Sequence, residues 1–227
     1  MASEESVVEV NAAGAVLEGS LTIAPRATGI AVFAHGSGSG RLSPRNLYVA
    51  GVLRERGLAT LLFDLLTEEE EKVDAFTREL RFNIPLLAER VLGATEWLRA
   101  RPDTAGLKLG YFGASTGAAA ALVAAAERSD VSAVVSRGGR PDLAAPYLGG
   151  VRAPTLLVVG GWDEAVIEMN RDAMAQMTCE KELVIVPGAT HLFEEPGKLE
   201  EVARLAAAWF ARHLGPAGEG PHPPGAH

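Results

Sequence analysis

Short apolar runs alternate with helix-like stretches along most of this chain, and that alternation restricts its fold more than any other feature. Each run ends at glycine, proline or a charged residue, as β-strands usually do. Because strands that alternate with helices are typical of parallel sheets, the pattern predicts an α/β fold with a mainly parallel sheet and helices on both faces. The expected strands are a short run from Val7 and residues 16–23, 28–35, 58–64, 107–113, 131–136, 155–161 and 182–187; the most distinct expected helices are residues 84–100, 115–128 and 198–213.

One domain should hold nearly the whole chain. With 227 residues the chain is long enough to bury a large core, and residues 1–214 are predicted to form a single domain. The remaining segment, 215–227, reads GPAGEGPHPPGAH. Its proline and glycine content predicts a flexible tail, so we assign no function to His222 or His227.

Charge and cysteine content exclude several classes of protein. The net charge of -8 argues against a nucleic-acid-binding protein, because binding to phosphates needs clustered Lys and Arg. Cys179 is the only cysteine, which excludes an internal disulfide and a multi-cysteine metal site. The N-terminal MASEESVVEV lacks the features of a signal peptide, and no run of about 18 apolar residues follows. We expect a cytoplasmic protein that does not bind membranes.

The acidic stretch LTEEEEKVDAF begins at Leu66 and has two interpretations. Thr67 and Glu70 have the spacing of a capping box, and acids in a first helical turn favour the helix dipole. The alternative is an acidic interaction surface. We prefer the start of a helix.

The segment GASTG, from Gly113 to Gly117, lies between an expected strand and an alanine-rich expected helix. This is the setting of a nucleophile elbow, a strained turn that presents a serine hydroxyl above the edge of the sheet. Small residues prevent collisions there, and the helix N-terminus favours negative charge on a reacting oxygen. Ser115 is therefore the candidate nucleophile. The simpler alternative is that it only caps the helix.

A serine nucleophile needs a base, and the base needs an acid that orients it. Asp163 in GGWDEAV and His191 in PGATHLFEEP each follow an expected strand. Because the carboxyl ends of parallel strands meet at one edge of a sheet, both can converge on Ser115. Glu164 is a rival for the acid. A helix cap for Asp163 and a loop histidine bonded to the backbone for His191 are the structural alternatives.

Acyl transfer also needs N–H groups that stabilise the oxyanion. One donor should be the Thr116 N–H. The second should come from the glycine-rich stretch AHGSGSG after the third expected strand, where Ser37 N–H is the first choice and Gly38 the alternative. A phosphate-binding loop is the competing interpretation, but the stretch lacks the Gly-Lys-Ser/Thr ending of a P-loop.

These motifs and their order resemble the dienelactone-hydrolase-like group of α/β-hydrolases, over nearly all of Val7 to Leu214. HGSGSG at the oxyanion loop, GASTG at the elbow, GGWDE at the acid and GATHLF at the base match the family pattern. The resemblance implies an α/β-hydrolase fold with a sheet of about eight strands, the second of them antiparallel. Dienelactone hydrolases themselves use a cysteine where Ser115 stands, which weakens the analogy in substrate. The chain is also similar to hydrolase domains that follow phosphoribosyltransferase domains in some bacterial proteins, and we expect the module here to stand alone.

The residues predict a serine esterase that cleaves a carboxylic ester through an acyl-enzyme and needs no metal or organic cofactor. Lactone, thioester and amide substrates share this chemistry and stay open. The alternatives are an acyltransferase with the same triad and a non-catalytic binding module of the same fold. The oligomeric state, including a homodimer, also stays open.

Several residues are candidates for binding a small ester-like substrate. His35, Arg41 and Arg45 lie in or after the glycine-rich stretch, Arg137 and Arg140 follow a later strand, and Trp162 precedes Asp163. Arginines in these places could pair with a substrate carboxylate, and the alternative is a surface or packing role.

The walls of the pocket can be outlined from the connections between strands. Residues 65–82 are expected to form one wall. The connection from 136 to 155 is short and rich in glycine and proline, which leaves little space for a large lid. We therefore expect an open pocket.

Overall fold

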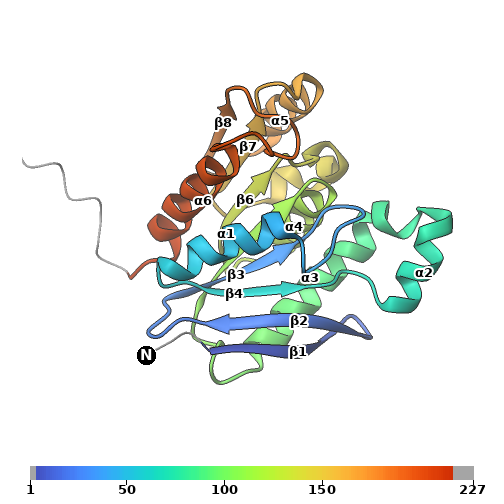
Figure 1. The fold of residues 1–227 in the computed structure, drawn as a ribbon, viewed down its shortest axis with the longest axis vertical. Coiled ribbons are helices and arrows are strands. Elements are labelled where there is room, and N and C mark those ends of the chain that lie inside the picture. The colour runs from blue at the N-terminus through green and yellow to red at the C-terminus, as the bar shows by residue number, and fades with distance from the viewer. Residues whose placement is uncertain (1–3, 217–227) are drawn as a thin grey trace, which may run out of the picture.

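The computed structural model describes residues 4–216, so residues 217–227 of the expected tail lie outside the described range. Eight strands form one sheet in the order β1-β2-β4-β3-β5-β6-β7-β8 (Figure 1). β2 runs antiparallel to both of its neighbours, and all strands from β4 to β8 in this order are parallel to one another. The predicted α/β fold and the antiparallel second strand are confirmed. The strands are β1 Glu4–Ala12, β2 Ala15–Ile23, β3 Gly29–Ala34, β4 Ala59–Phe63, β5 Lys108–Ala114, β6 Val131–Arg137, β7 Thr155–Gly160 and β8 Lys181–Val186.

Helices cover both faces of the sheet (Figure 1). α1 and α6 pack against each other on one face, and α3, α4 and α5 lie on the other. Each face has its own hydrophobic core, because the strands are buried on both sides. The helices are α1 Pro44–Glu55, α2 Glu68–Thr77, α3 Ile84–Arg99, α4 Thr116–Glu127, α5 Glu164–Gln176 and α6 Lys198–Leu214, with 3-10 helices η1 Leu80–Phe82 and η2 Pro141–Gly150.

Two connections position the site. α2 and η1 follow β4 and project beyond the carboxyl end of the sheet (Figure 1). α2 begins with the predicted capping box, in which Thr67 and Glu70 exchange hydrogen bonds. Between β6 and β7 the chain forms η2, which packs against α4 and α5. This packing agrees with the expected lack of a large lid.

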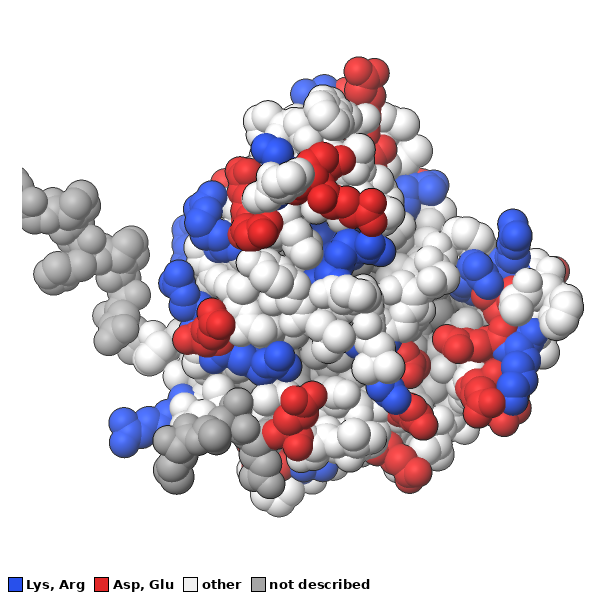
Figure 2. Space-filling model, in the orientation of Figure 1, with Lys and Arg blue, Asp and Glu red and all other residues white. Residues whose placement is uncertain are grey.

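Charged side chains are mixed over the surface. On the face drawn in Figure 2, arginines and lysines are interspersed with acids and form no continuous stripe of one sign. Among the helices of residues 4–216, none combines the length and apolar character that a membrane crossing requires.

Candidate active site

Ser115 occupies a strained turn between β5 and α4. β5 ends at Ala114 and α4 begins at Thr116. Ser115 itself has φ 51° and ψ -121°, a conformation that costs a non-glycine residue about 1–3 kcal/mol. Its side chain makes no capping hydrogen bond with α4. The turn therefore has the geometry of a nucleophile elbow, and the alternative of a helix-capping serine is not what the structure shows.

Two glycines allow this turn because α4 approaches the sheet very closely. A Cβ on Gly113 would lie 2.4 Å from the Cα of Ala118, and a Cβ on Gly117 would lie 2.2 Å from the carbonyl oxygen of Ala34. Real Cβ atoms do not approach backbone atoms this closely. The glycines of GASTG are thus required by packing, and they bring the N-terminus of α4 next to the end of β3.

Asp163 and His191 are joined at the carboxyl ends of β7 and β8. His191 Nδ1 and Asp163 Oδ2 are 2.6 Å apart, so Nδ1 carries the proton of this bond and Nε2 is left to act elsewhere. Asp163 precedes α5 but makes no side-chain capping bond. Glu164 is exposed and is the first residue of α5. The hydrogen bond of His191 is therefore with Asp163 and not with Glu164.

Ser115 and His191 line the same compact pocket of about 190 Å³. The main chain of Ser115 is fixed by a bond from its N–H to the Arg137 carbonyl, 3.2 Å, and by a bond from the Arg140 N–H to its own carbonyl, 3.1 Å. Both bonds attach the elbow to the end of β6 and the turn after it. The remaining lining residues are Gly36, Ser37, Ser39, Arg45, Ala114, Arg137 and Leu192.

The loop after β3 lies directly beside the elbow. Ser37 N–H donates a hydrogen bond of 2.9 Å to Thr116 Oγ1, and Ser37 lines the compact pocket. Thr116 is the first residue of α4, so its own N–H has no acceptor within the helix. Gly38, the alternative donor, has a φ of 69° and lines only the neighbouring wide pocket.

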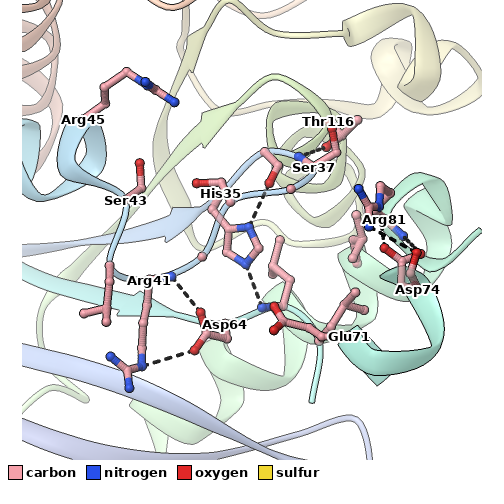
Figure 3. Close-up of a pocket in the computed structure, with 18 of the residues that line it drawn as sticks. His35, Ser37, Arg41, Ser43, Arg45, Asp64, Glu71, Asp74, Arg81 and Thr116 are labelled. Atoms are coloured by element: carbon pink, nitrogen blue, oxygen red, sulfur yellow. Dashed lines mark hydrogen bonds and ion pairs between the residues drawn. The ribbon is translucent and has the colours of Figure 1, made fainter. Parts of the chain in front are cut away.

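A wide pocket of about 700 Å³, whose lining is drawn in Figure 3, adjoins the compact one. Both pockets share Gly36, Ser37, Ser39 and Arg45 in their linings. The expected wall at residues 65–82 is present, because Leu65, Leu66, Glu71, Asp74 and Arg81 face this space.

Acids and arginines pair with one another around the wide pocket. The backbone N–H of Arg41 donates a hydrogen bond of 2.7 Å to Asp64, and its guanidinium forms an ion pair with the same carboxylate, with Nε 3.1 Å from Oδ2. Arg81 Nε bonds buried Asp74 at 2.5 Å and, with two backbone N–H groups, holds the pKa of that carboxyl below its usual range. Partial burial and the nearby carboxylates of Asp64 and Asp74 raise the pKa of Glu71.

His35 connects the ends of two strands. Its Nδ1 lies 3.0 Å from the Gly36 carbonyl oxygen, and its Nε2 accepts the Leu65 N–H at 3.0 Å (Figure 3). Burial lowers the pKa of this imidazole, which agrees with a neutral ring that has a proton on Nδ1. Both nitrogens are used by the protein, so His35 shapes the wall of the wide pocket.

The other candidate substrate-binding residues fall into different places. Arg45 lines both pockets and Arg137 lines the compact one. Arg140 pairs with Asp142 and lines neither pocket. Trp162 is 67% exposed and is also outside both linings.

Several lining residues were missed by the sequence analysis. Asp64 directly follows β4, and the rule that used strand ends to select Asp163 and His191 could have selected it. Asp74 and Arg81 lie within the expected wall at residues 65–82 but were not singled out, and Leu192 had no such signal. Within residues 4–216, no group of three or more His, Cys, Asp or Glu side chains could hold a metal ion.

Known proteins share the family and the fold of this chain. The model of the dienelactone hydrolase family matches residues 45–214. The crystal structure of dienelactone hydrolase from Anabaena variabilis is 62% identical, with a TM-score of 0.92 over 93% of this chain and 99% of that chain. XC6422 from Xanthomonas campestris, described as a serine hydrolase without lid, shares the fold at 21% identity and a TM-score of 0.74, over 94% of this chain and 97% of that chain.

Two curated Mycobacterium tuberculosis proteins, each named "putative phosphoribosyl transferase", are 59% identical over 215 residues. The match covers 93% of this chain and 48% of each relative. The chain therefore spans about half the length of the curated relatives that it matches.

Proposed function

The chain belongs to the dienelactone hydrolase family, and we propose that it acts as a serine hydrolase on a carboxylic ester, in the broad sense that includes lactones and thioesters. In this proposal Ser115 attacks the substrate carbonyl and forms an acyl-enzyme, which water then cleaves. The strained elbow at Ser115, in the same pocket lining as the Asp163-bonded His191, is the observation that supports it.

Each residue of the proposed triad has one task. His191 Nε2 takes the proton of the Ser115 hydroxyl as the carbonyl carbon is attacked, and gives it to the leaving oxygen, or to the leaving sulfur of a thioester, when the bond to the acyl carbon breaks. Asp163 accepts a hydrogen bond of 2.6 Å from the Nδ1–H of His191. This bond holds the ring in the required tautomer and stabilises the imidazolium. In the hydrolysis of the acyl-enzyme, His191 takes a proton from water while the water oxygen attacks the acyl carbon. His191 then gives this proton to the Ser115 oxygen as the acyl group leaves.

We further propose that the oxyanion is bound by the N–H groups of Thr116 and Ser37, with Gly38 as the alternative to Ser37. The Thr116 N–H lies at the free end of α4, where the helix dipole favours negative charge. The Ser37 N–H already bonds Thr116 Oγ1, so it must share or exchange this acceptor when an oxyanion forms.

The two pockets suggest how a substrate is divided. The reacting carbonyl belongs at the junction, where Ser37 lines both spaces. The wide pocket can take the larger part of the substrate. We do not propose phosphoribosyl transfer for this chain. The two relatives named for that activity are about twice as long as the matched segment.

The experiment compares hydrolysis of p-nitrophenyl esters of increasing acyl length by the wild type and by Ser115→Ala, His191→Ala and Asp163→Asn. We expect the Ser115 and His191 variants to lose at least ~10³-fold in kcat, as removal of triad members does. Ser6→Ala, which changes an exposed residue of β1, is the matched control and should retain full activity. Hydrolysis that persists unchanged in Ser115→Ala would contradict the proposal.

A further inference from the structure

Arg137 is a buried cation next to the candidate nucleophile. It ends β6, and in the sheet it pairs with Ala114, the residue before Ser115. Its carbonyl accepts the Ser115 N–H. Only 7% of the residue is exposed, and it lines the compact pocket together with Ser115 and His191.

The charge of Arg137 has no counterion in the described chain. Among residues 4–216, no ion pair and no side-chain hydrogen bond involves it, and its Nη1 is buried without any partner. Burial, together with repulsion from Arg45, lowers its pKa to about 10, so the guanidinium is still charged at neutral pH. A buried charge is normally paired and hydrogen-bonded, because leaving it unpaired is costly.

Arg45 adds a second cation to the same pocket. It lies in the first turn of α1 and lines both pockets. Its Nη1 bonds the exposed carboxylate of Glu194 at 3.1 Å, and its Nε is buried without a partner. In Figure 3 its side chain points away from the acids of the wide pocket.

The two pockets therefore differ in charge. Around the wide pocket, Arg41 pairs with Asp64 and Arg81 pairs with Asp74. The lining of the compact pocket contains two arginines and no carboxylate. The missing negative charge is one that a ligand would supply.

We propose that Arg137, assisted by Arg45, binds a compact anionic group of the substrate, a carboxylate or a phosphate, beside Ser115. The inference rests on the proposed hydrolase function and adds the class of its substrate, an ester with a negative charge close to the reacting carbonyl. A planar guanidinium can donate two parallel hydrogen bonds to either anion. The small volume of the pocket, about 190 Å³, excludes a bulky group on that side.

The first test measures binding without catalysis. Glutarate or inorganic phosphate is added to the wild type, Arg137→Gln and Arg56→Gln, and the Tm is followed. Arg56 is an exposed arginine at the end of α1, before β4 and thus at the opposite end of the sheet. We expect one of the anions to raise the Tm of the wild type and of Arg56→Gln but not of Arg137→Gln. The anion with the larger effect identifies carboxylate or phosphate as the group recognised.

The second test measures selectivity. A p-nitrophenyl ester that carries the preferred anion, the hemiglutarate or its phosphonate counterpart, is compared with the uncharged carboxamide analogue. The wild type should prefer the anionic ester by ~10- to 100-fold in kcat/KM, the usual effect of a charge-assisted hydrogen bond. Arg137→Gln should lose this preference, and Arg45→Gln should reduce it. If Arg137→Gln does not fold, Arg45→Gln serves as the test variant.

Two results would overturn the proposal: equal or absent Tm shifts in the wild type and Arg137→Gln, or a wild type without preference for the anionic ester. These failures can be separated from failure of the hydrolase function. If Ser115 reacts with an uncharged phosphonate ester but neither anion has an effect, the hydrolase stands and the anion site is wrong. If anions bind through Arg137 but Ser115 does not react, the anion site stands and the hydrolase is wrong.

Discussion

The Ser37 N–H donates a hydrogen bond of 2.9 Å to the Thr116 hydroxyl, and this bond fastens the loop after β3 to the first residue of α4. The two residues are 79 positions apart in the chain. One hydrogen bond thus links the residues that carry both proposed oxyanion donors. The Thr116 side chain holds the loop in place, while the Thr116 N–H is a proposed donor to the oxyanion.

Replacing Thr116 tests that contact. Thr116→Val keeps the shape but removes the acceptor, which leaves the Ser37 N–H unpaired and the loop free to shift. We expect kcat to fall by up to ~10-fold, corresponding to the ~0.5–1.5 kcal/mol net contribution of a hydrogen bond, with little change in KM. Thr116→Ser should restore the rate. A valine variant with wild-type kcat would show that the bond does not position the loop.

Replacing Asp163 separates it from its neighbour. Asp163→Asn exchanges the bonded carboxylate for an amide that cannot stabilise the imidazolium, so kcat should fall by ~10²–10⁴-fold. Glu164→Gln changes an exposed residue of α5 and should leave kcat near the wild-type value. Ester hydrolysis rates of the two purified variants check this. The reverse order of activities would assign the acid to Glu164.

A methyl group on Gly117 should disrupt the elbow. Its Cβ would lie 2.2 Å from the Ala34 carbonyl oxygen and 2.3 Å from that of His35, so Gly117→Ala should lower the free energy of unfolding by at least ~2 kcal/mol. Gly106→Ala is the control, because a Cβ there meets nothing within 4 Å. Urea denaturation of both variants measures the effect, and similar stabilities would contradict the close approach of α4 to the sheet.

His35 should make stability depend on pH. Its folded-state pKa lies below the ordinary value of 6.5, so as pH falls the unfolded chain takes up a proton first. The stability that the neutral ring contributes is complete above about 6.5 and declines as pH falls towards the folded-state pKa. The difference in unfolding free energy between the wild type and His35→Gln should therefore shrink below pH 6.5.

The control for this experiment is internal. His213, whose pKa is also lowered by burial, is present in both proteins and cancels in the comparison. A difference that stays constant from pH 8 to pH 5 would mean that His35 does not titrate differently in the folded and unfolded protein.

The positions of Ser115, Asp163 and His191 after the carboxyl ends of strands could be predicted from the sequence, because they depend on local patterns. GASTG between a strand and a helix placed Ser115 at a turn, and the runs before Asp163 and His191 placed both at strand ends. The choice between Asp163 and Glu164 needed the structure. A shift of α5 by one residue would change which of the two carboxylates contacts the histidine.

The charge state of the pockets could not be predicted. Arg41, Arg45 and Arg137 looked equivalent as arginines near strand ends, yet Arg41 bonds Asp64 and Glu18 while Arg137 is buried and unpaired among the described residues. Which arginine finds a partner depends on side-chain directions across elements that are far apart in sequence. For the same reason the outward position of Trp162 had no signal in its neighbours.

The most direct test of the account is covalent labelling of the folded protein with an uncharged phosphonate ester, followed by intact-mass and peptide mass spectrometry. The account predicts one added phosphonyl group, located on Ser115, with labelling abolished in Ser115→Ala and greatly slowed in His191→Ala. An unlabelled wild type, or a label on another residue that persists in Ser115→Ala, would contradict the assignment of Ser115 as the nucleophile.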